Sequence, residues 1–168
     1  MSPLTFTPAR KQDAALLVQL YNAAFRADYE RYGECPAYGR TVEQMQASIR
    51  RFPKLIIRRD GAPVGVLSAQ QQDEGTYYIG CLCVIPQAQR QGIGSAALQW
   101  FCQQHPDWRV ISLITPIDKA ETCNSIKRTV LNSPARSWMA ACAWRRWKRG
   151  EQPWTSGLWK PHVCACAG

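Results

Sequence analysis

The segment Gln89–Ser95 limits the fold of this chain more than any other, because its glycines, Gly92 and Gly94, lie between two strongly patterned runs. The β-rich run Thr76–Ile85 precedes it, and the helix-like run Gly94–His105 follows it. Glycine lets a ligand approach the backbone closely. The first amides of a helix, together with the helix dipole, attract anions. The order of strand, glycine loop and helix therefore predicts a site for a phosphate or pyrophosphate.

Two side chains strengthen this prediction, since Ser95 offers a hydroxyl donor and Arg90 a positive charge. A plain glycine turn with a helix cap is the simpler interpretation, but the position after a long strand favours the anion site. A dinucleotide-binding fold is the sharper alternative, because residues 92–97 nearly match its fingerprint and Asp118 follows at somewhat more than the usual spacing. That fingerprint normally opens its domain, and the loop Pro86–Gln91 is long for the tight turn it requires.

The rest of the first 124 residues alternates strand-like and helix-like runs. Asp60 and Gly61 predict a hairpin turn, and Thr41 is suited to cap a helix. The polar and aromatic stretch Asp28–Pro36 is typical of a loop that lines a pocket. The strands are expected at Leu4–Pro8, Leu55–Arg59, Pro63–Gln70, Thr76–Ile85 and Arg109–Ile114. The helices are expected at Asp13–Arg26, after Thr41 with Val42, Met45, Ile49 and Phe52 on one face, at Gly94–His105 and at Thr115–Asn124.

Length and composition favour one globular domain in a reducing compartment. The chain has 168 residues, of which 46% are hydrophobic and 20% charged. It has no apolar run of the roughly 20 residues that a membrane helix needs, and its N-terminus lacks the apolar core of a signal peptide. Its eight cysteines are irregularly spaced, and the spacing of His162, Cys164 and Cys166 matches no standard zinc site. We expect a cytoplasmic protein without metal or membrane partner.

A family resemblance rests on Ile85–Leu98, which is similar to the acetyl-CoA loop of the GNAT N-acetyltransferases. The core of that loop is Gln/Arg-x-x-Gly-x-Gly/Ala, and Gln89, Gly92 and Gly94 occupy these positions. The preceding Cys81–Ile85 resembles the central strand of the family. The resemblance covers about residues 4–124 and implies an α/β (α+β) fold. Its central sheet is mixed but mostly antiparallel, flanked by helices, and opens in a V for the cofactor.

The resemblance also implies a set of cofactor contacts, with acetyl-CoA as co-substrate. The loop would hold the pyrophosphate, the strand before it would pair with the pantetheine arm, and the amide near Leu82 would stabilise the oxyanion. An asparagine at the start of the last helix would add a contact. The implied residues are Leu82, Cys83, Val84, Gln89, Arg90, Gln91, Gly92, Ile93, Gly94, Ser95 and Asn124.

The catalytic base is the part of the pattern that this sequence does not reproduce. Some members carry a glutamate on the central strand, and Tyr78 occupies that position here. A tyrosine is a poor base near neutral pH, so an aromatic lining of the acceptor pocket is its favoured role. Glu34 or Asp28 could act through water. An acyl-enzyme on Cys81 or Cys83 is disfavoured, because cysteines in buried strands are usually inert.

The residues after Asn124 differ in composition from those before it. Residues 1–124 carry a net charge of +2, whereas residues 125–168 carry +7 and five of the seven tryptophans. The family's usual ending, Asn-x-x-Tyr-x-x-x-Gly-Phe or a close variant of it followed by a hairpin, is missing. We therefore separate a GNAT domain, 1–124, from an atypical basic tail, 125–168, and expect the C-terminal hairpin to be missing or disrupted.

A one-base shift explains this tail. Codons for Ser125–Pro134 exist that, after insertion of one T, encode Phe-Tyr-Lys-Lys-Asn-Gly-Phe-Glu-Phe-Thr. Together with Asn124, that restores the family ending. We therefore expect the tail to be an out-of-frame product or disordered. Single-stranded nucleic-acid binding through Trp144–Arg149 is the alternative, since these residues interleave tryptophan with positive charge.

The function expected from the sequence is transfer of an acetyl group from acetyl-CoA to a primary amine of a small molecule or peptide. The altered C-terminus would impair it. Two alternatives remain open: a non-catalytic protein that binds CoA, and a nucleic-acid-binding module that uses the tail. Nucleic acid is the less favoured partner, and a homodimer is left open.

Overall fold

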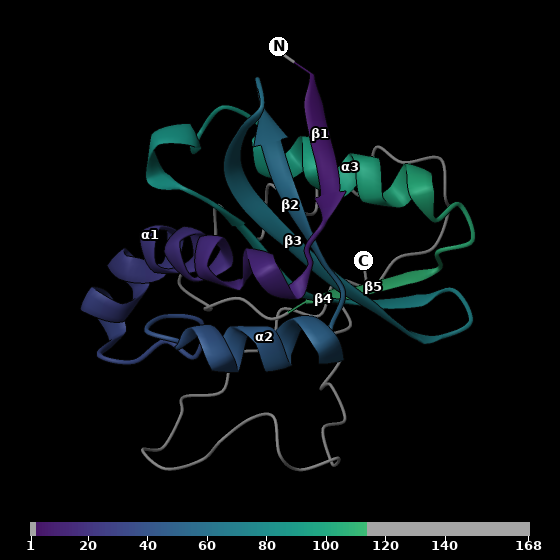
Figure 1. Cartoon of the computed structure of the whole chain (residues 1–168). Helices are drawn as coiled ribbons and strands as arrows, with labels where there is room; N and C mark the ends of the chain where they lie inside the picture. The colour runs from purple at the N-terminus through teal and green to yellow at the C-terminus, as the bar shows by residue number, and fades with distance from the viewer. Residues whose placement is uncertain (1–2, 114–168) are drawn as a thin grey trace.

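The computed structural model describes residues 3–113, which form a sheet with helices on both faces (Figure 1). The helix expected at 115–124, Asn124, the C-terminal hairpin and the tail all lie outside these residues. The elements in chain order are β1 (Leu4–Pro8), η1 (Lys11–Asp13), α1 (Ala14–Tyr32), α2 (Val42–Arg51), β2 (Lys54–Arg59), β3 (Ala62–Asp73), β4 (Thr76–Val84), η2 (Pro86–Ala88), α3 (Ile93–Gln104) and β5 (Val110–Leu113). In this part of the chain no helix is both long and apolar enough to span a membrane.

The strands lie in the order β1-β2-β3-β4-β5. The first three pairings are antiparallel, and β5 runs parallel to β4. The expected mixed, mostly antiparallel sheet is confirmed. Asp60 and Gly61 join β2 to β3 with φ angles of 50° and 78°, the left-handed backbone that a tight hairpin turn requires. The predicted hairpin is therefore present.

The first helix is longer than the sequence suggested. The segment from Asp28 was expected to be a loop, but α1 continues through Tyr32. No helix-breaking residue occurs before Gly33, which ends the helix at a φ of 74° and donates its N–H to the carbonyl of Tyr29. An ion pair between Arg26 and Glu30, four residues apart, adds support to the last turns. The loop prediction was wrong for residues 28–32.

The second helix begins at the cap that the sequence predicts. The Thr41 hydroxyl accepts from the Gln44 N–H at 3.2 Å, and the Gln44 side chain accepts from the Thr41 N–H at 3.0 Å. Met45 is fully buried, whereas Val42 is 36% exposed and Phe52 lies beyond the helix as its C-cap. The predicted apolar face is therefore confirmed for Met45 and for Ile49, which packs against the same buried cluster, and is wrong for Val42; Phe52 is half-buried but lies just outside the helix.

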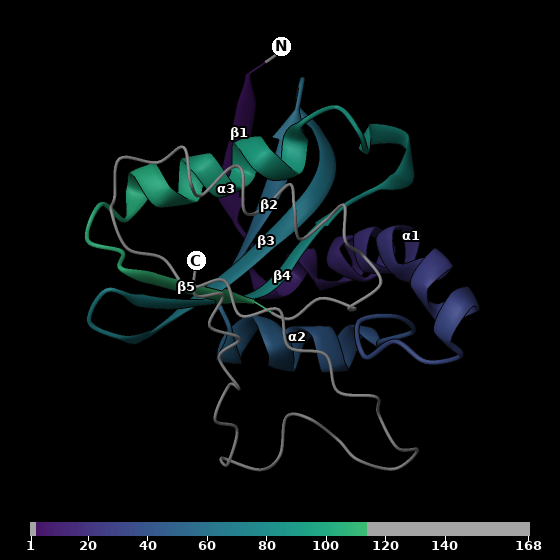
Figure 2. The same cartoon turned by 180° about the vertical axis from the view of Figure 1, so that it is seen from behind.

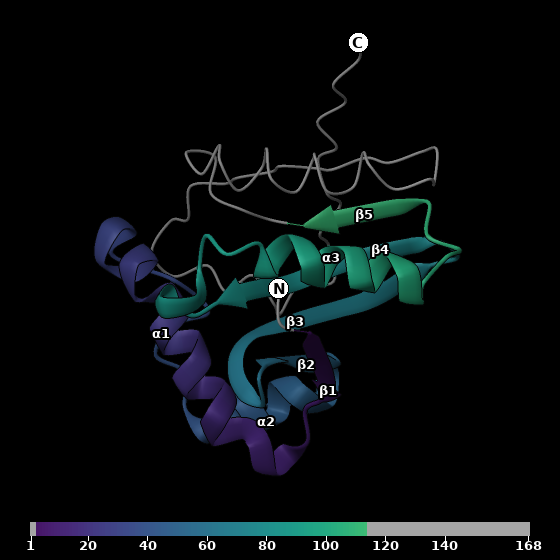
Figure 3. The same cartoon turned by 90° about the horizontal axis from the view of Figure 1, so that it is seen from above.

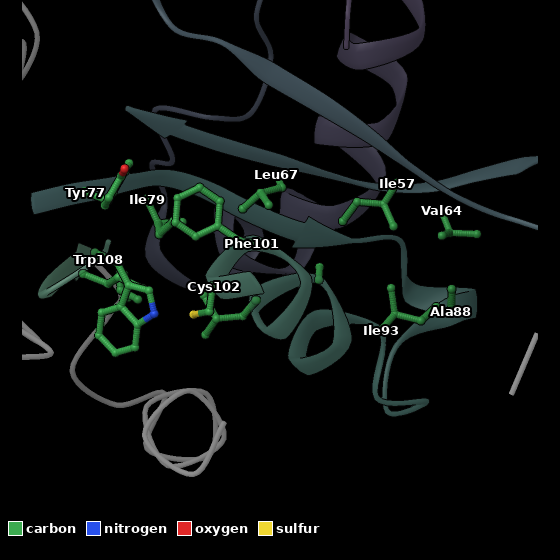
Figure 4. Packing of buried hydrophobic residues seen from close by; sticks show 14 residues of the cluster. Ile57, Val64, Leu67, Tyr77, Ile79, Ala88, Ile93, Phe101, Cys102 and Trp108 are labelled. Atoms are coloured by element: carbon green, nitrogen blue, oxygen red, sulfur yellow. The ribbon is translucent and has the colours of Figure 1, made fainter. Parts of the chain in front are cut away.

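Each face of the sheet has its own apolar core. Figure 2, seen from behind, shows α3 in front of the strands, while α1 and α2 lie on the opposite side. In the close-up of the α3 side, Phe101 of α3 lies against Ile79 of β4 (Figure 4). The buried cluster on the α3 face comprises Ile57, Val64, Leu67, Tyr77, Ile79, Ala88, Ile93, Ala97, Leu98, Phe101, Cys102, Trp108, Ile111 and Leu113. The cluster under α1 and α2 comprises Ala14, Leu17, Leu20, Tyr21, Met45, Ile56, Val66 and Cys83.

An irregularity at Gly80 changes which side chains of β4 face which core. Cys81 lies opposite Ser68, but Ile79 lies opposite Ala69, so Gly80 is an extra residue in the ladder. Ile79 therefore packs in the α3 core, while Cys81 packs against the core under α1 and α2. Without the bulge, strict alternation would place both on one face. The bulge thus places a thiol on the α1 and α2 face.

Candidate active site

The second half of β4 has a free edge among the described residues. Residues Thr76–Ile79 pair with β5, and Gly80–Val84 continue past its described end (Figure 3). On the other side, β4 remains paired with β3 as far as Val84. Within residues 3–113, no strand pairs with the second edge of this half. A backbone edge of this kind is suited to pairing with an extended ligand.

The loop that follows β4 is folded back onto the end of that strand. The Gln89 side-chain amide donates to the Val84 carbonyl at 2.8 Å, and the Gln91 amide donates to the Gln87 carbonyl at 3.1 Å. Ala88 is buried in the α3 core and anchors the loop from inside. The loop is therefore shaped by its own contacts and lies directly beyond the free half of β4.

The start of α3 presents backbone groups rather than side chains. Gly92 is its N-cap, with a φ of 74° and no side-chain cap. Ile93 buries its side chain in the core, so its backbone alone is available to a ligand. A Cβ at Gly94 would meet nothing within 4 Å, although glycine in a helix costs about 1 kcal/mol relative to alanine. Space left open beside a helix N-terminus fits the close approach of an anion.

Positive charge reaches this loop from two directions. Arg90 is exposed within the loop and adopts a φ of 59°. Arg59, at the end of β2, hydrogen-bonds the side chain of Gln91. Arg59 was missed in the sequence because its neighbourhood depends on strand pairing, although the two consecutive arginines at the end of that strand were visible. The loop thus combines helix amides with two guanidinium groups.

The remaining predicted cofactor residues lie at either end of this region. Leu82 is half-buried and packs towards the α3 core, and Val84 does the same. Ser95 lies in the first turn of α3 and is half-buried. The structure therefore brings together the predicted residues of β4, the loop and the helix start. Asn124 lies outside the described residues.

Tyr78 is half-buried at the bulge, close to Gly80. Burial, with a smaller contribution from Cys81, raises its pKa above the usual value. A general base needs a pKa near the working pH, so this shift is in the wrong direction for a base. Tyr78 stays protonated at neutral pH and can donate a hydrogen bond. The two other candidates for the base lie elsewhere. Asp28 is half-buried on α1, and Glu34 is exposed just after the end of that helix.

The two thiols of β4 differ in character. A hydrogen bond between the two sulfurs, together with burial, raises the pKa of Cys83 well above its usual value. The same bond lowers the pKa of Cys81, and a hydrogen bond from Tyr21 and the charges of Lys54 and Arg40 act in the same direction. Cys83 is therefore an inert core thiol. Cys81 is half-buried and more acidic, with polar neighbours that the sequence did not reveal.

Lys54 is the residue of this region that the sequence analysis overlooked. It opens β2, and only 5% of its surface is exposed. Its ammonium lies 3.5 Å from the Ser68 hydroxyl and 5.9 Å from the centre of the Phe52 ring. Burial lowers the pKa of Lys54 to about 8. One signal was available: in a strand, Lys54 must share a face with Ile56, which is buried.

Both the sequence and the fold are similar to those of known acetyltransferases. The sequence model described as the acetyltransferase (GNAT) family matches residues 16–125, more than half of the chain. No curated protein matches the sequence. Among solved structures, an acetyltransferase from Thermus thermophilus superimposes with a TM-score of 0.63 at 18% identity, over 76% of this chain and 88% of that one.

Two further structures share the fold. The aminoglycoside acetyltransferase meta-AAC0020, from an uncultured soil metagenomic sample and in complex with sisomicin, has a TM-score of 0.60 at 19% identity. It aligns over 86% of this chain and 97% of its own. A GNAT family acetyltransferase from Brucella melitensis in complex with acetyl-CoA has a TM-score of 0.50 at 20% identity. The alignment covers 73% of this chain and 82% of that one. Sheet order, loop and family match agree, and this chain belongs to the GNAT family of acetyltransferases.

Proposed function

We propose that this chain transfers an acetyl group from acetyl-CoA to a primary amine of a small molecule or peptide. The observation that carries the proposal is one juxtaposition. The free half of β4, Gly80–Val84, runs directly into the glycine loop and the uncapped start of α3. The pantetheine arm and the pyrophosphate, two adjoining parts of coenzyme A, need these two kinds of site in this order.

Each part of the proposed site matches one part of the cofactor. Backbone groups of Cys83 and Val84 would pair with the pantetheine amides, as an added strand would. The residues 89–95 would hold the pyrophosphate through helix amides, Arg90 and the Ser95 hydroxyl. Arg59, joined to Gln91, adds positive charge beside these phosphates. Asn124 completes the proposed cofactor contacts.

The proposed reaction is a direct transfer without an acyl-enzyme. A neutral amine attacks the thioester carbonyl, a carbon–nitrogen bond forms and the carbon–sulfur bond breaks. The N–H near Leu82 would stabilise the oxyanion that develops on the carbonyl. Tyr78, which stays protonated, would contribute a hydrogen-bond donor and an aromatic wall to the acceptor side. The buried thiol of Cys83 takes no part.

The acceptor is proposed only as a chemical class. One structural neighbour is an aminoglycoside acetyltransferase bound to sisomicin, a molecule with several amines. We therefore propose a small-molecule amine as the first class to test, with a peptide N-terminus as the second. A panel of sisomicin, spermidine and a short unblocked peptide separates these classes, with release of free thiol from acetyl-CoA as the readout.

The cofactor site is tested by Gly94→Asp, with Gly94→Ala as the matched control. A side chain at Gly94 meets open space and needs no left-handed backbone, so both variants should fold. Asp would place a negative charge where a pyrophosphate would bind. We expect calorimetry on the full chain to give acetyl-CoA binding at least about tenfold weaker for Asp, and a clearly smaller loss for Ala, which fills the same space without adding a charge.

Equal affinity in the wild type and the Asp variant would remove the loop from the cofactor site. Binding without acetylation of any amine would favour the non-catalytic CoA-binding alternative. Salt-dependent binding of a single-stranded oligonucleotide, without CoA binding, would favour the nucleic-acid module. Each outcome selects a different function for the chain.

We also propose that residues 125–168 are the product of a one-base shift and form no part of the acetyltransferase domain. The family match ends at residue 125, next to the change in charge and tryptophan content. The coding DNA tests this directly. Codons compatible with the shift would encode the tyrosine and Gly-Phe of the family ending in the other frame, and incompatible codons would contradict the proposal.

A further inference from the structure

Lys54 is a cation held in a place that disfavours charge. It is 95% buried by surface area, and its polar contact is the neutral Ser68 hydroxyl, which itself donates to the Pro53 carbonyl at 3.0 Å. In the part of the chain that the structure describes, neither ion pair involves Lys54. Burial of an unpaired charge destabilises a fold. A lysine kept there needs a reason other than packing.

Strand register points this lysine towards the centre of the proposed site. Lys54 lies opposite Ser68 on β3, and Ser68 lies opposite Cys81 on β4. Two residues apart in a strand, Lys54 shares a face with Ile56, and Ser68 shares a face with Val66. Ile56 and Val66 belong to the cluster under α1 and α2, so Lys54 and Ser68 lie on that face as well. The lysine chain therefore runs across the sheet towards β4, beside the bulge at which β4 loses its second strand partner among the described residues.

An exposed glycine at the bulge lies beside the polar contact of this lysine. Gly80 is exposed, and a Cβ built on it would lie 3.5 Å from the Tyr78 ring and 3.9 Å from the Ser68 hydroxyl. Because glycine has no side chain, this space beside Ser68 is left unfilled by Gly80. The same hydroxyl contacts the Lys54 nitrogen. The exposed backbone at Gly80 and the buried amine of Lys54 thus lie beside the same hydroxyl.

Within residues 3–113, the charged and titratable groups near Lys54 come from β4, from α1 and from the segment before α2. Cys81 and Cys83 of β4 favour its charged form, and Arg40, from the segment before α2, disfavours it. Tyr21 of α1 hydrogen-bonds Cys81. The ring centre of Phe52, 5.9 Å from the Lys54 ammonium, also lies 5.3 Å from the Arg51 guanidinium. Desolvation outweighs these charges, so the neutral amine is well populated just above neutral pH.

We propose that Lys54, in its neutral form, accepts the proton that the acceptor ammonium must lose before it attacks the thioester, with the acceptor bound at the exposed bulge of β4 at Gly80. This inference rests on the function proposed above and deepens it. It assigns the base to β2 and leaves Tyr78 as a protonated neighbour.

The protons and electron pairs balance in this sequence. The acceptor ammonium gives one proton to Nζ of Lys54 and gains a free lone pair. Its nitrogen then forms a bond to the acyl carbon, and the carbon–sulfur bond breaks with its electron pair on sulfur. The second amine proton leaves with that thiolate as free coenzyme A. After product release, the Lys54 ammonium returns its proton to solvent.

The first test needs no known acceptor. The full chain is labelled with acetic anhydride between pH 6 and 11, with and without coenzyme A, and each lysine is followed by mass spectrometry. We expect Lys54 to react with a midpoint near pH 8 and coenzyme A to slow its labelling at least about fivefold. Lys11, exposed on η1, is the control, and coenzyme A should not protect it from labelling.

The second test compares Lys54→Met, Lys54→Arg and the control Lys11→Met in acetyl transfer to the best amine of the panel. Met should lower kcat/KM about 100-fold and abolish the rise in rate through pH 8. Arg keeps the charge but cannot give up its proton, so it should fail to rescue the rate. A merely structural lysine would change the rate through stability, and the pH profile would keep its shape.

The outcomes separate this inference from the proposed function. If calorimetry shows no binding of coenzyme A to the folded chain, the proposed function fails. If coenzyme A binds but Lys54 is unreactive, or reacts without protection, the assignment of Lys54 is overturned. If no amine of the panel is acetylated, the labelling experiment still decides for or against Lys54. A Lys54→Met variant with an unchanged pH profile also overturns the assignment.

Discussion

The two faces of the central sheet have different chemistry. The face under α3 is a large apolar cluster, and its polar contact, between the Tyr77 hydroxyl and Asp107, lies at one end of the sheet. The face under α1 and α2 also has an apolar cluster, but it adjoins Lys54, Ser68 and Cys81. The α3 face contributes mainly apolar packing, whereas the other face combines apolar packing with buried polar and titratable side chains. Opposite effects of mutation on the two faces test this difference.

The largest expected effect is on the α3 face. Phe101 is 3% exposed and packs edge-on to Tyr77 with ring centres 5.5 Å apart. Phe101→Ala leaves a cavity that the neighbouring helix and strand cannot fill, so we expect the free energy of unfolding to fall by about 4 kcal/mol. Urea denaturation of the full chain measures it. A loss below about 1 kcal/mol would mean that this face is not the rigid core described above.

The opposite sign is expected for Lys54→Met on the other face. The folded chain holds the pKa of Lys54 at about 8, below the ordinary value of 10.5, so the unfolded chain binds more protons between these two pH values. Stability therefore rises with pH through this window, and the full cost of the buried charge is present below pH 8. At pH 7 we expect Met to raise the free energy of unfolding by up to about 3 kcal/mol.

Urea denaturation at pH 7 and pH 10 checks this prediction. The gain from Met should shrink at pH 10, because the wild-type lysine is then largely neutral in the folded chain. The Lys11→Met variant controls for the loss of a surface charge, and its stability should be unchanged. A Lys54→Met variant less stable than the wild type at pH 7 would show that the ammonium is stabilised by a partner.

The smallest effect is expected at the polar edge of the α3 face. The Tyr77 hydroxyl donates to both carboxylate oxygens of Asp107, at 3.2 and 3.1 Å. Tyr77→Phe removes this donor while the ring keeps its contacts, so we expect a loss of about 1 kcal/mol in the free energy of unfolding. Asp107→Asn, which keeps an acceptor, serves as the milder comparison. No loss in Tyr77→Phe would leave the α3 face stabilised by its apolar contacts alone.

Much of the fold follows from local sequence pattern. β1 begins and ends where the sequence predicts, and Thr41 and the Asp60-Gly61 pair act as predicted. These features depend on neighbouring residues along the chain, so one sequence is enough to find them. The glycine loop belongs to the same group, because its position between strand and helix is local.

The rest depends on contacts between distant segments. The bulge at Gly80 depends on how β4 pairs with β3, although a glycine inside a strand is a known sign of one. The position of Lys54 beside the site depends on the register of three strands, and that of Arg59 beside the loop depends on the path of the chain after β4. Lys54 was therefore recognisable as a candidate base only from the pairing of distant strands, and not from the local sequence pattern.

Hydrogen exchange with and without acetyl-CoA tests most directly the claim that β4 and the loop form the cofactor site. We predict slower amide exchange in peptides that cover Gly80–Val84 and residues 89–95, and unchanged exchange in β1 and β2. That pattern would show the cofactor pairing with the free half of β4 and the start of α3. Unchanged exchange in these peptides under saturating acetyl-CoA, or protection confined to other elements, would contradict the account.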